Sequence, residues 1–374
     1  MPVSCAYFKE NICRSCTLLQ TDYSAQILLK EKALIDALSP VSLPLLATVT
    51  SSETGFRNKA KLVVTGTSET PVLGLIDREI LDCPVHDPAI NKILHDLIPF
   101  IRVAKLEPYQ IKEKKGELKG IIIFSGDESY VRFVLRSKEG LDRIRKNLPS
   151  LLTLHPEIKS VSVNIQPVHQ AILEGDEEIP LGPENFIGQK YKNFSLHIRP
   201  QGFVQTNQQV ARKLYETAAA WVDEQKISRF MELFSGQGAF SFHSASFVKE
   251  ATGIELNPEA VKMANESAVT LGLKHLTFVP LPAENSAKMI AEKKPELILV
   301  NPPRRGLADT LNILLQARPE YIIYSSCSVE SLGKDLKSLI PFYTPERAQI
   351  FDMFPHTEHF ETLVLLKRLS PVKA

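Results

Sequence analysis

From about residue 201 onward, short apolar runs alternate with stretches of helical periodicity, and this rhythm constrains the fold more than any other feature of the chain. Short apolar runs separated by helices are typical of buried parallel strands in a doubly wound α/β sheet. The last two runs have too few residues between them for a crossover helix, so we expect them to pair antiparallel at one edge. The predicted strands cover residues 230–234, 252–256, 277–281, 297–300, 321–325, 348–353 and 362–366.

The preceding part of the chain has a different rhythm, in which strands are separated mainly by turns. With helices predicted at 87–103 and 141–148, this pattern predicts an α+β domain with an antiparallel sheet. The 374 residues exceed the roughly 100–200 of one domain, so several parts are expected. They are a cysteine-rich segment at 1–48 with a helix at 25–38, a middle domain at 49–200 and an α/β domain at 201–374.

Four of the five cysteines lie in the first quarter of the chain. Cys5, Cys13 and Cys16 form a compact three-thiol group, which a fourth thiol brought in by folding could close. Four thiolates suit either a tetrahedral zinc or an iron–sulfur cluster, and Cys83 is the candidate for the fourth. A disulfide is the weaker interpretation, because no apolar signal stretch opens the chain and a reducing cytoplasm is the default location.

The net charge is only +1, so a protein that binds a polyanion would have to gather its cations locally. Arg57, Lys59 and Lys61 alternate with other residues ahead of an apolar run, which would place the three on one face of a strand. A solvated charged face explains this pattern equally well. No run of about 18 apolar residues occurs, which argues against a membrane span.

A glycine-rich turn follows the first strand of the α/β domain. Gly236 and Gly238 allow a sharp turn close to a ligand, and Glu255, at the end of the next predicted strand, suits ribose hydroxyls. A dinucleotide-binding loop would carry a third glycine, which is missing here. S-adenosylmethionine has no phosphate and suits a shorter loop, although a tight turn without a ligand is a further alternative.

Three later segments should meet at the same sheet edge. Asn301 begins an Asn-Pro-Pro-Arg loop after the fourth strand, and Cys327 follows the fifth strand just before a predicted helix whose N-terminal dipole would favour a thiolate. The segment 354–361 between the last two strands offers carboxylates and imidazoles for proton transfer. Common Pro-Pro loops, an inert buried cysteine and a bland polar loop are the alternatives.

Together these motifs resemble those of the S-adenosylmethionine-dependent RNA uracil-C5 methyltransferases. Within that family they most resemble the branch that acts on large-subunit ribosomal RNA and lacks an N-terminal oligonucleotide-binding barrel. The resemblance spans nearly the whole chain. Besides the four cysteines, it is carried by segments 55–59, 199–207, 232–240, 301–306, 325–327 and 352–357.

The resemblance implies a Rossmann-like class I methyltransferase domain, an RNA-binding middle domain and a [4Fe-4S] cluster rather than zinc on the four cysteines. It implies that Cys327 is the nucleophile and Glu361 the proton-abstracting base. The implied partner is 23S ribosomal RNA, with uracil 747 as the target, in the cytoplasm, without a membrane or an obligate protein partner. The residues that it assigns to S-adenosylmethionine are Gln205, Phe234, Glu255 and Asn301.

The chemistry of uracil explains why these groups are needed. Its C5 is not nucleophilic enough to take a methyl group until a thiolate adds at C6, and a base must later remove the C5 proton so that the thiolate can leave. The target base must first leave its stack, at a cost of a few kcal/mol. The alternatives are methylation of a different rRNA or tRNA uridine, a catalytically inert iron–sulfur RNA-binding protein, and a redox scaffold in which Cys327 is merely buried.

Overall fold

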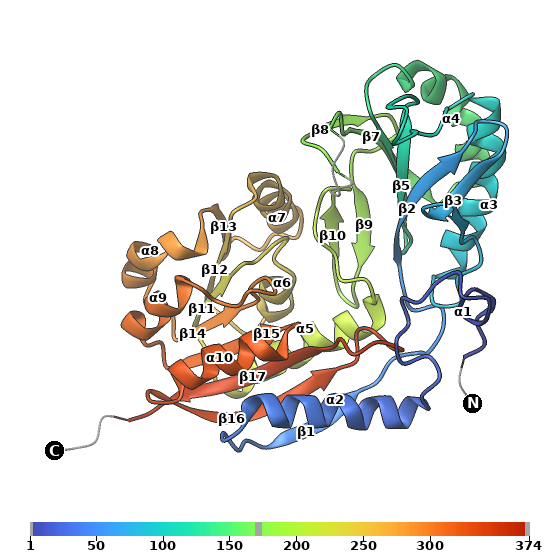
Figure 1. Ribbon diagram of the computed structural model, residues 1–374. Coiled ribbons are helices and arrows are strands. Elements are labelled where there is room, and N and C mark those ends of the chain that lie inside the picture. Colours follow the sequence, from blue (N-terminus) through green and yellow to red (C-terminus); the bar gives the residue numbers. More distant parts are fainter. Residues whose placement is uncertain (1–2, 169–173, 371–374) are drawn as a thin grey trace. The chain divides into compact units, whose positions relative to one another are not determined.

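The computed structural model describes residues 3–168 and 174–370, which form two compact units (Figure 1). Unit 1 contains Thr17–Ser51 and the chain from Gly202 onward. Unit 2 contains Val3–Cys16 and Ser52–Gln201. No helix in the described ranges is both long and apolar enough to cross a membrane.

Unit 1 is built on an eight-stranded sheet. Five neighbouring strands run parallel, whereas the last strand is antiparallel to both of its neighbours, which confirms the predicted α/β pattern and the antiparallel pairing of the last two strands. The predicted edge position of that pair is wrong, because the strand Leu45–Val49 lies beyond it. The strand order is β1 (Leu45–Val49), β16 (Tyr343–Phe351), β17 (Glu361–Arg368), β15 (Tyr321–Ser326), β14 (Leu297–Val300), β11 (Arg229–Leu233), β12 (Glu250–Glu255) and β13 (Leu276–Pro280).

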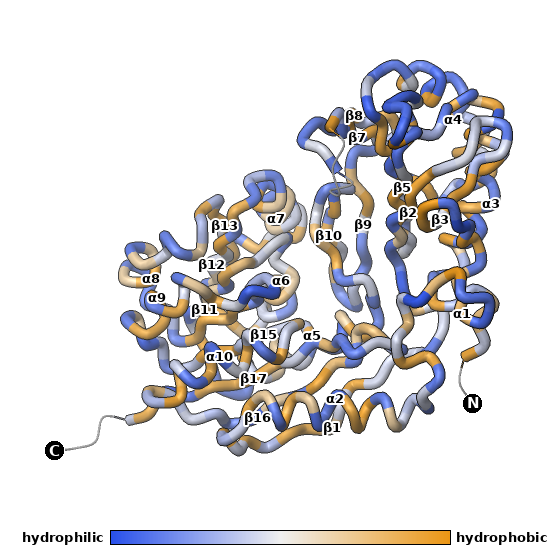
Figure 2. Tube along the Cα trace, viewed as in Figure 1, coloured by the Kyte–Doolittle hydropathy of each residue, from blue (hydrophilic) through white to orange (hydrophobic). Residues whose placement is uncertain are grey.

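Helices bury the central strands of this sheet, which is why those strands are almost wholly apolar (Figure 2). One face is covered by α2 (Tyr23–Leu38), α8 (Ala287–Lys293), α9 (Thr310–Ala317) and α10 (Val329–Leu339), which share a core with it. The short helix η1 (Ala283–Asn285) adds Ala283 to the same core. Three described helices of unit 1 contribute no residue to it, namely α5 (Gln208–Glu224), α6 (Ala239–Ser244) and α7 (Pro258–Thr270).

The N-terminal residues 17–51 differ from the sequence-based division, which ended a cysteine-rich segment at residue 48. In the structure α2 packs its apolar side through Leu34 and Leu38 into the core of unit 1. Strand β1 extends the sheet by pairing parallel with β16. A pairing between segments about 300 residues apart leaves no local periodicity to read, so the segment could not be placed from its own sequence.

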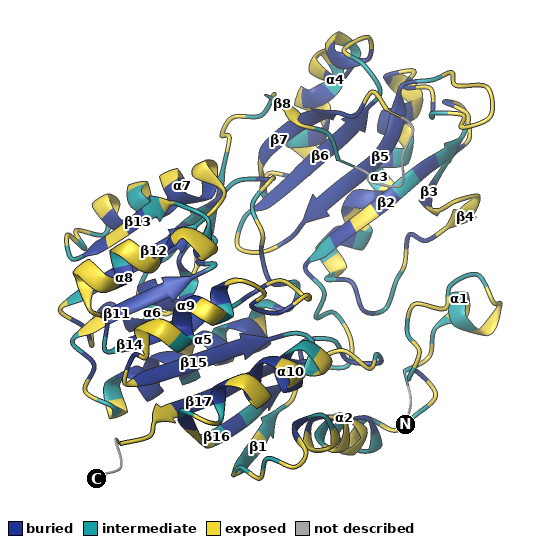
Figure 3. Ribbon diagram, turned by 60° about the vertical axis from the view of Figure 1, so that its left-hand side comes forward, coloured by how far each residue is buried: buried dark blue, intermediate teal, exposed yellow. Residues whose placement is uncertain are grey.

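Unit 2 is an α+β unit around a seven-stranded sheet. Its three strands Leu118–Phe124, Ser129–Leu135 and Ile158–Ile165 are almost wholly buried, while its helices expose one side (Figure 3). The predicted antiparallel sheet is correct except for the strands Ser129–Leu135 and Ile158–Ile165, which pair parallel because a helix crosses over between them. The order is β4 (Arg78–Glu79), β3 (Pro71–Leu75), β2 (Lys59–Gly66), β5 (Leu118–Phe124), β6 (Ser129–Leu135), β7 (Ile158–Ile165) and β8 (Glu177–Pro180). Also in unit 2 are α1 (Ala6–Lys9), α3 (Pro88–Val103), α4 (Leu141–Leu154), β9 (Ile187–Lys190) and β10 (Ser195–Ile198).

Candidate active site

A cavity of about 550 Å³ lies at the carboxyl edge of the unit 1 sheet. Open α/β sheets bind ligands at this edge because the loops that follow the parallel strands converge there. The cavity brings together every residue that the sequence assigned to cofactor binding or catalysis. These residues are Gln205, Phe234, Glu255, Asn301, Cys327 and Glu361.

The loop after β11 depends on three residues with left-handed backbone conformations. Phe234, Gly236 and Gly238 have φ values of 61°, 53° and 79°. At Gly238 a Cβ atom would stand 2.3 Å from the ring of Phe278, whereas at Gly236 it would meet nothing within 4 Å. The second glycine is therefore required by packing, and the first keeps one side of the cavity open.

The carboxylate of Glu255 is held in place by two backbone N–H groups. Gly236 donates to Oε2 and Asn257 donates to Oε1, each at 2.8 Å. Because a carboxylate has about four lone-pair positions, it can still accept hydrogen bonds from two ligand hydroxyls. This geometry suits the adjacent hydroxyls of a ribose.

Cys327 lies between β15 and the start of α10, where the Ser328 side chain accepts a hydrogen bond from Ser331 N–H. Burial raises the pKa of the Cys327 thiol, the negative charge of Glu361 raises it further, and a hydrogen bond and the charge of Arg304 oppose this rise. We expected the helix to favour a thiolate. Instead burial dominates, and the pKa of the thiol is raised rather than lowered.

Glu361 is the first residue of β17, and its side chain is 4% exposed. Burial raises the pKa of this carboxyl to about 7, although a hydrogen bond from Gln205 and the charge of Arg304 both lower it. Its Oε2 has no hydrogen-bond partner within the described part of the chain. A buried carboxyl with a free oxygen and a pKa near neutrality is well suited to receive a proton.

Arg304 is a candidate functional residue that the sequence analysis missed. The Asn-Pro-Pro-Arg loop was singled out there for Asn301, and Arg304 was given no role. In the structure its guanidinium influences both reactive groups, because it is hydrogen-bonded to Cys327 and lowers the pKa of Glu361. The signal was available, since Arg304 follows the prolines directly at the ligand-binding edge.

The other acid and base candidates of segment 354–361 do not line this cavity. Glu358 and His359 are exposed and line a second cavity of about 390 Å³, which shares Cys327 and Arg304 with the first. His356 is buried and contacts Gln26 instead of lining either cavity. Of these four titratable residues, Glu361 is the one that lines the larger cavity.

Comparison with known proteins places this site in a family. A profile of the tRNA (uracil-5-)-methyltransferase family matches residues 184–369. The chain is 43% identical to the 23S rRNA (uracil(747)-C(5))-methyltransferase of Shewanella loihica, with 98% of this chain and 100% of the relative covered. It is 43% identical to the same enzyme of Proteus mirabilis, with 97% and 99% covered. The chain belongs to the family of RNA uracil-C5 methyltransferases.

A solved structure supports the fold of this methyltransferase. The Pyrococcus abyssi tRNA (uracil-54, C5)-methyltransferase, in complex with S-adenosyl-L-homocysteine, superposes with a TM-score of 0.78 at 24% identity. The match covers 94% of this chain and 85% of that one. The Rossmann-like fold of the C-terminal part is therefore established.

The four N-terminal cysteines of the methyltransferase all belong to unit 2. Burial raises the pKa of Cys16 to about 12, and the charges of Cys83, Cys13 and Cys5 raise it as well, so the four thiols lie within electrostatic reach of one another. Among residues 3–168 and 174–370, no group of three or more metal-ligating side chains is close enough to hold a metal ion.

The basic residues in and just before β2 are partly withdrawn from solvent. Arg57 and Lys59 are half-buried, and burial lowers the pKa of Lys59 to about 8, with the charge of Lys61 lowering it further. Lys61 is exposed and forms an ion pair with Glu174 at 2.5 Å. The predicted alternation holds, because Ala60 and Leu62 point into the core of unit 2.

Proposed function

We propose that this enzyme transfers a methyl group from S-adenosylmethionine to C5 of a uridine in 23S ribosomal RNA, with uracil 747 as the target. The observation that carries the proposal is the pairing of the Cys327 thiol with the Glu361 carboxyl, whose pKa is about 7, in one cavity with Arg304 beside both. The names of relatives that match the chain from end to end support the substrate.

The cofactor assignment fits the cavity. Its volume of about 550 Å³ lies within the usual range for small-molecule sites. Glu255 would accept the ribose hydroxyls, and Phe234, Gln205 and Asn301 would complete the cofactor contacts from three other loops. S-adenosylmethionine supplies an electrophilic methyl group on its sulfonium.

Cys327 begins the reaction by adding its sulfur to C6 of the flipped uracil. The thiol must first give up its proton to solvent, and Arg304 is placed to stabilise the thiolate through its charge and hydrogen bond. The C5–C6 double bond opens as the S–C6 bond forms, and its electrons make C5 nucleophilic enough to take the methyl group. The product of this step carries both the methyl group and a proton on C5.

Glu361 completes the reaction by taking the C5 proton on its unpaired Oε2. The electrons of the C–H bond restore the C5–C6 double bond, and the S–C6 bond breaks to release Cys327. Gln205 hydrogen-bonds the carboxyl of Glu361 and thereby orients it. The proton is returned to solvent after the product leaves.

The four cysteines of unit 2 would hold a [4Fe-4S] cluster. The charges of Cys83, Cys13 and Cys5 all act on Cys16, so the four thiols lie within electrostatic reach of one another. Four cysteine thiolates are the usual donor set of such a cluster. The resemblance of the sequence to the family is the reason for preferring the cluster to zinc, for which four thiolates would also serve.

Mass spectrometry of 23S ribosomal RNA from cells with and without the gene tests the target. Methyl-uridine should disappear from position 747 in the deletion strain and return with the wild-type gene but not with Cys327→Ala. A methyl group lost from another uridine would overturn the target and leave the chemistry intact. Unchanged RNA methylation would overturn the function.

The roles of Cys327 and Glu361 can be separated with radiolabelled cofactor. Cys327→Ala should bind S-adenosylmethionine but form no covalent RNA complex. Glu361→Gln should methylate once and remain attached to the RNA as a denaturant-resistant band that carries the label. Glu358→Gln is the matched variant, since Glu358 is an exposed carboxylate three residues away. If the labelled band forms with Glu358→Gln instead, Glu361 is not the base.

A further inference from the structure

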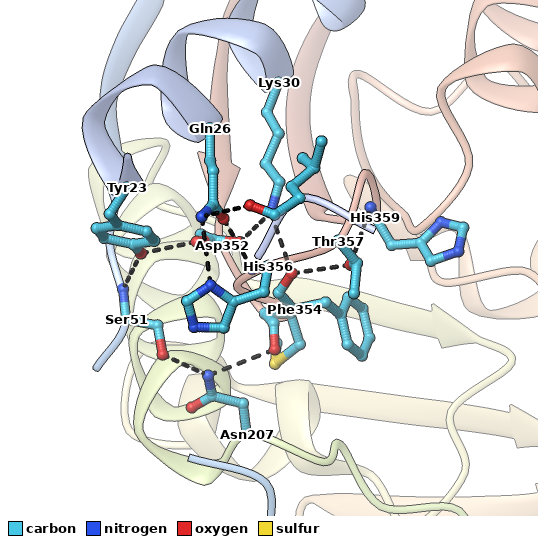
Figure 4. A network of polar contacts seen from close by, with 12 residues as sticks. Tyr23, Gln26, Lys30, Ser51, Asn207, Asp352, Phe354, His356, Thr357 and His359 are labelled. Carbon is cyan, nitrogen blue, oxygen red and sulfur yellow. Dashed lines mark hydrogen bonds and ion pairs between the residues drawn. The ribbon is translucent and has the colours of Figure 1, made fainter. Parts of the chain in front are cut away.

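A buried polar network joins the N-terminal residues 18–51 to the connection between β16 and β17 (Figure 4). This connection, residues 352–360, leads directly into Glu361. The residues on both sides of the network belong to unit 1. It therefore fixes a segment of the candidate active site from a part of the chain that carries no proposed catalytic group.

Lys30 supplies the central contact of the network. Its ammonium donates to Asp352 Oδ1 at 2.6 Å and to the carbonyl of Phe354 at 3.1 Å, so one cation holds the chain on both sides of Met353. Tyr23 donates its hydroxyl to Asp352 Oδ2 at 2.7 Å. The Lys30 and Asp352 side chains are 1% and 0% exposed.

Gln26, one helical turn before Lys30 on α2, holds the next part of the connection. Its Oε1 accepts the backbone N–H of His356 at 2.8 Å, and its Nε2 donates to the carbonyl of Thr21 at 2.8 Å. The N–H of Leu18 donates to the carbonyl of His356 at 2.9 Å. His356 has a φ of 64°, a left-handed conformation that these contacts stabilise.

Asn207 connects the network to the loop that carries Gln205. Its Nδ2 donates to Ser51 Oγ at 2.7 Å and to the carbonyl of Met353 at 3.4 Å, and its Oδ1 accepts the Val210 N–H as the cap of α5. The network thus constrains the connection from two sides.

The connection borders the reacting end of the cavity. Cofactor ribose contacts are expected at Glu255, which ends β12, whereas β16 and β17 lie on the opposite side of β15 and its nucleophile Cys327. Phe354 lines the cavity from this side, and its carbonyl is the one that Lys30 holds. A shift of the connection would therefore displace groups around the target base rather than those around the ribose.

We propose that Lys30 is a positioning residue for methyl transfer: through Asp352 and the Phe354 carbonyl it sets the wall against which the target uracil is held. This inference rests on the proposed function. A buried ion pair is weak evidence for stability, because apolar side chains of similar volume often serve as well. The ion pair matters here for position rather than for stability, since the Lys30 ammonium fixes two acceptors at defined positions.

The test replaces the whole ion pair by apolar side chains, in the variant Lys30→Met/Asp352→Leu. Its unfolding, followed by the fluorescence of Trp221, should have a midpoint near that of the wild type. S-adenosylmethionine should bind with unchanged affinity in calorimetry. Single-turnover methyl transfer to RNA, with both substrates saturating, should fall by about 100-fold, the effect of a displacement of roughly 1 Å.

The same helix provides a matched control. Lys32 and Asp36 form an exposed ion pair, with side chains 70% and 62% exposed. Lys32→Met/Asp36→Leu makes the same chemical change on the solvent side of α2 and should leave the transfer rate unchanged. Tyr23→Phe removes one hydroxyl from the network and is a milder second variant, for which we expect a smaller loss in the same rate.

Three results would separate the outcomes. Equal transfer rates in the wild type, the buried double variant and Tyr23→Phe, with all proteins folded, would overturn the positioning role. If the buried double variant does not fold, an unchanged transfer rate in Tyr23→Phe is sufficient to overturn the positioning role. If the wild type transfers no methyl group to RNA, the proposed function is at fault rather than this inference.

Discussion

The buried carboxyl of Glu361 should make the stability of unit 1 depend on pH, and Glu361→Gln should remove that dependence. The pKa of Glu361 rises from 4.5 to about 7, mainly because burial penalises the charged form. Each pKa unit corresponds to about 1.36 kcal/mol, so ionising this group costs about 3 kcal/mol more in the folded protein than in the unfolded chain.

The sign of the effect follows from which state binds the proton more tightly. Glu361 is a carboxyl whose folded pKa is raised, so its contribution to stability is fully present below about pH 4.5 and is lost as the pH rises through about 7. Between about pH 5 and about pH 8, the free energy of unfolding of the wild type should fall by about 3 kcal/mol relative to that of the Gln variant. Other titrating groups are common to both proteins and cancel in the comparison.

Urea unfolding at the two pH values measures this difference. Trp221 is the only tryptophan of the chain and is buried in α5, so its fluorescence reports on unit 1. A loss of stability that the amide causes equally at every pH is a constant offset, and it does not enter a difference between two pH values. If the free-energy gap between wild type and variant is the same at both, Glu361 has an ordinary pKa and the argument for a tuned base fails.

Three further predictions concern other parts of the molecule. Anaerobically purified protein should contain about four irons per chain, with broad visible absorption; stoichiometric zinc without iron would contradict the cluster. Replacing Arg57, Lys59 and Lys61 by Ala should weaken RNA binding and flatten its salt dependence by roughly one unit of slope per lost phosphate contact, whereas the exposed Lys112, Lys114 and Lys115 provide a control triple variant. A left-handed backbone costs a residue with a Cβ atom about 1–2 kcal/mol, and Gly238→Ala should lower the free energy of unfolding in urea by more than this, because its Cβ meets Phe278. Gly272 has a φ of 68° and open space around it, so Gly272→Ala should show the backbone cost alone. Equal losses in the two variants would contradict the packing argument.

The arrangement of the active site could be predicted because the chemistry follows parallel strands. Once residues 297–300 and 321–325 are recognised as neighbouring buried strands, Asn301 and Cys327 must emerge at one edge. The antiparallel return of β17 could also be predicted, since the connection was too short for a helix, and it delivers Glu361 to that edge. Local periodicity was sufficient for each of these steps.

The contribution of α2 could not be predicted, because its partners lie more than 300 residues away. A lysine in an amphipathic helix normally faces solvent, and nothing near Lys30 distinguishes it from the exposed Lys32. The same applies to β1, whose pairing with β16 depends on the assembled sheet. The raised pKa of Cys327 was missed for a related reason: the helix that should favour a thiolate is visible in the sequence, whereas the burial that outweighs it is not.

Under the proposed mechanism, the electrostatics of the site explain why Cys327 and Glu361 would act in order. An ionised Glu361 raises the pKa of Cys327, so a thiolate forms less readily while the base is charged. The charge of Arg304 lowers the pKa of both groups and therefore opposes this effect. Once the sulfur is bonded to C6 it carries no charge, and an ionised Glu361 no longer has an anionic neighbour at that position. Formation of the adduct therefore removes the charge repulsion between nucleophile and base at the stage when the base must be ionised to accept the C5 proton.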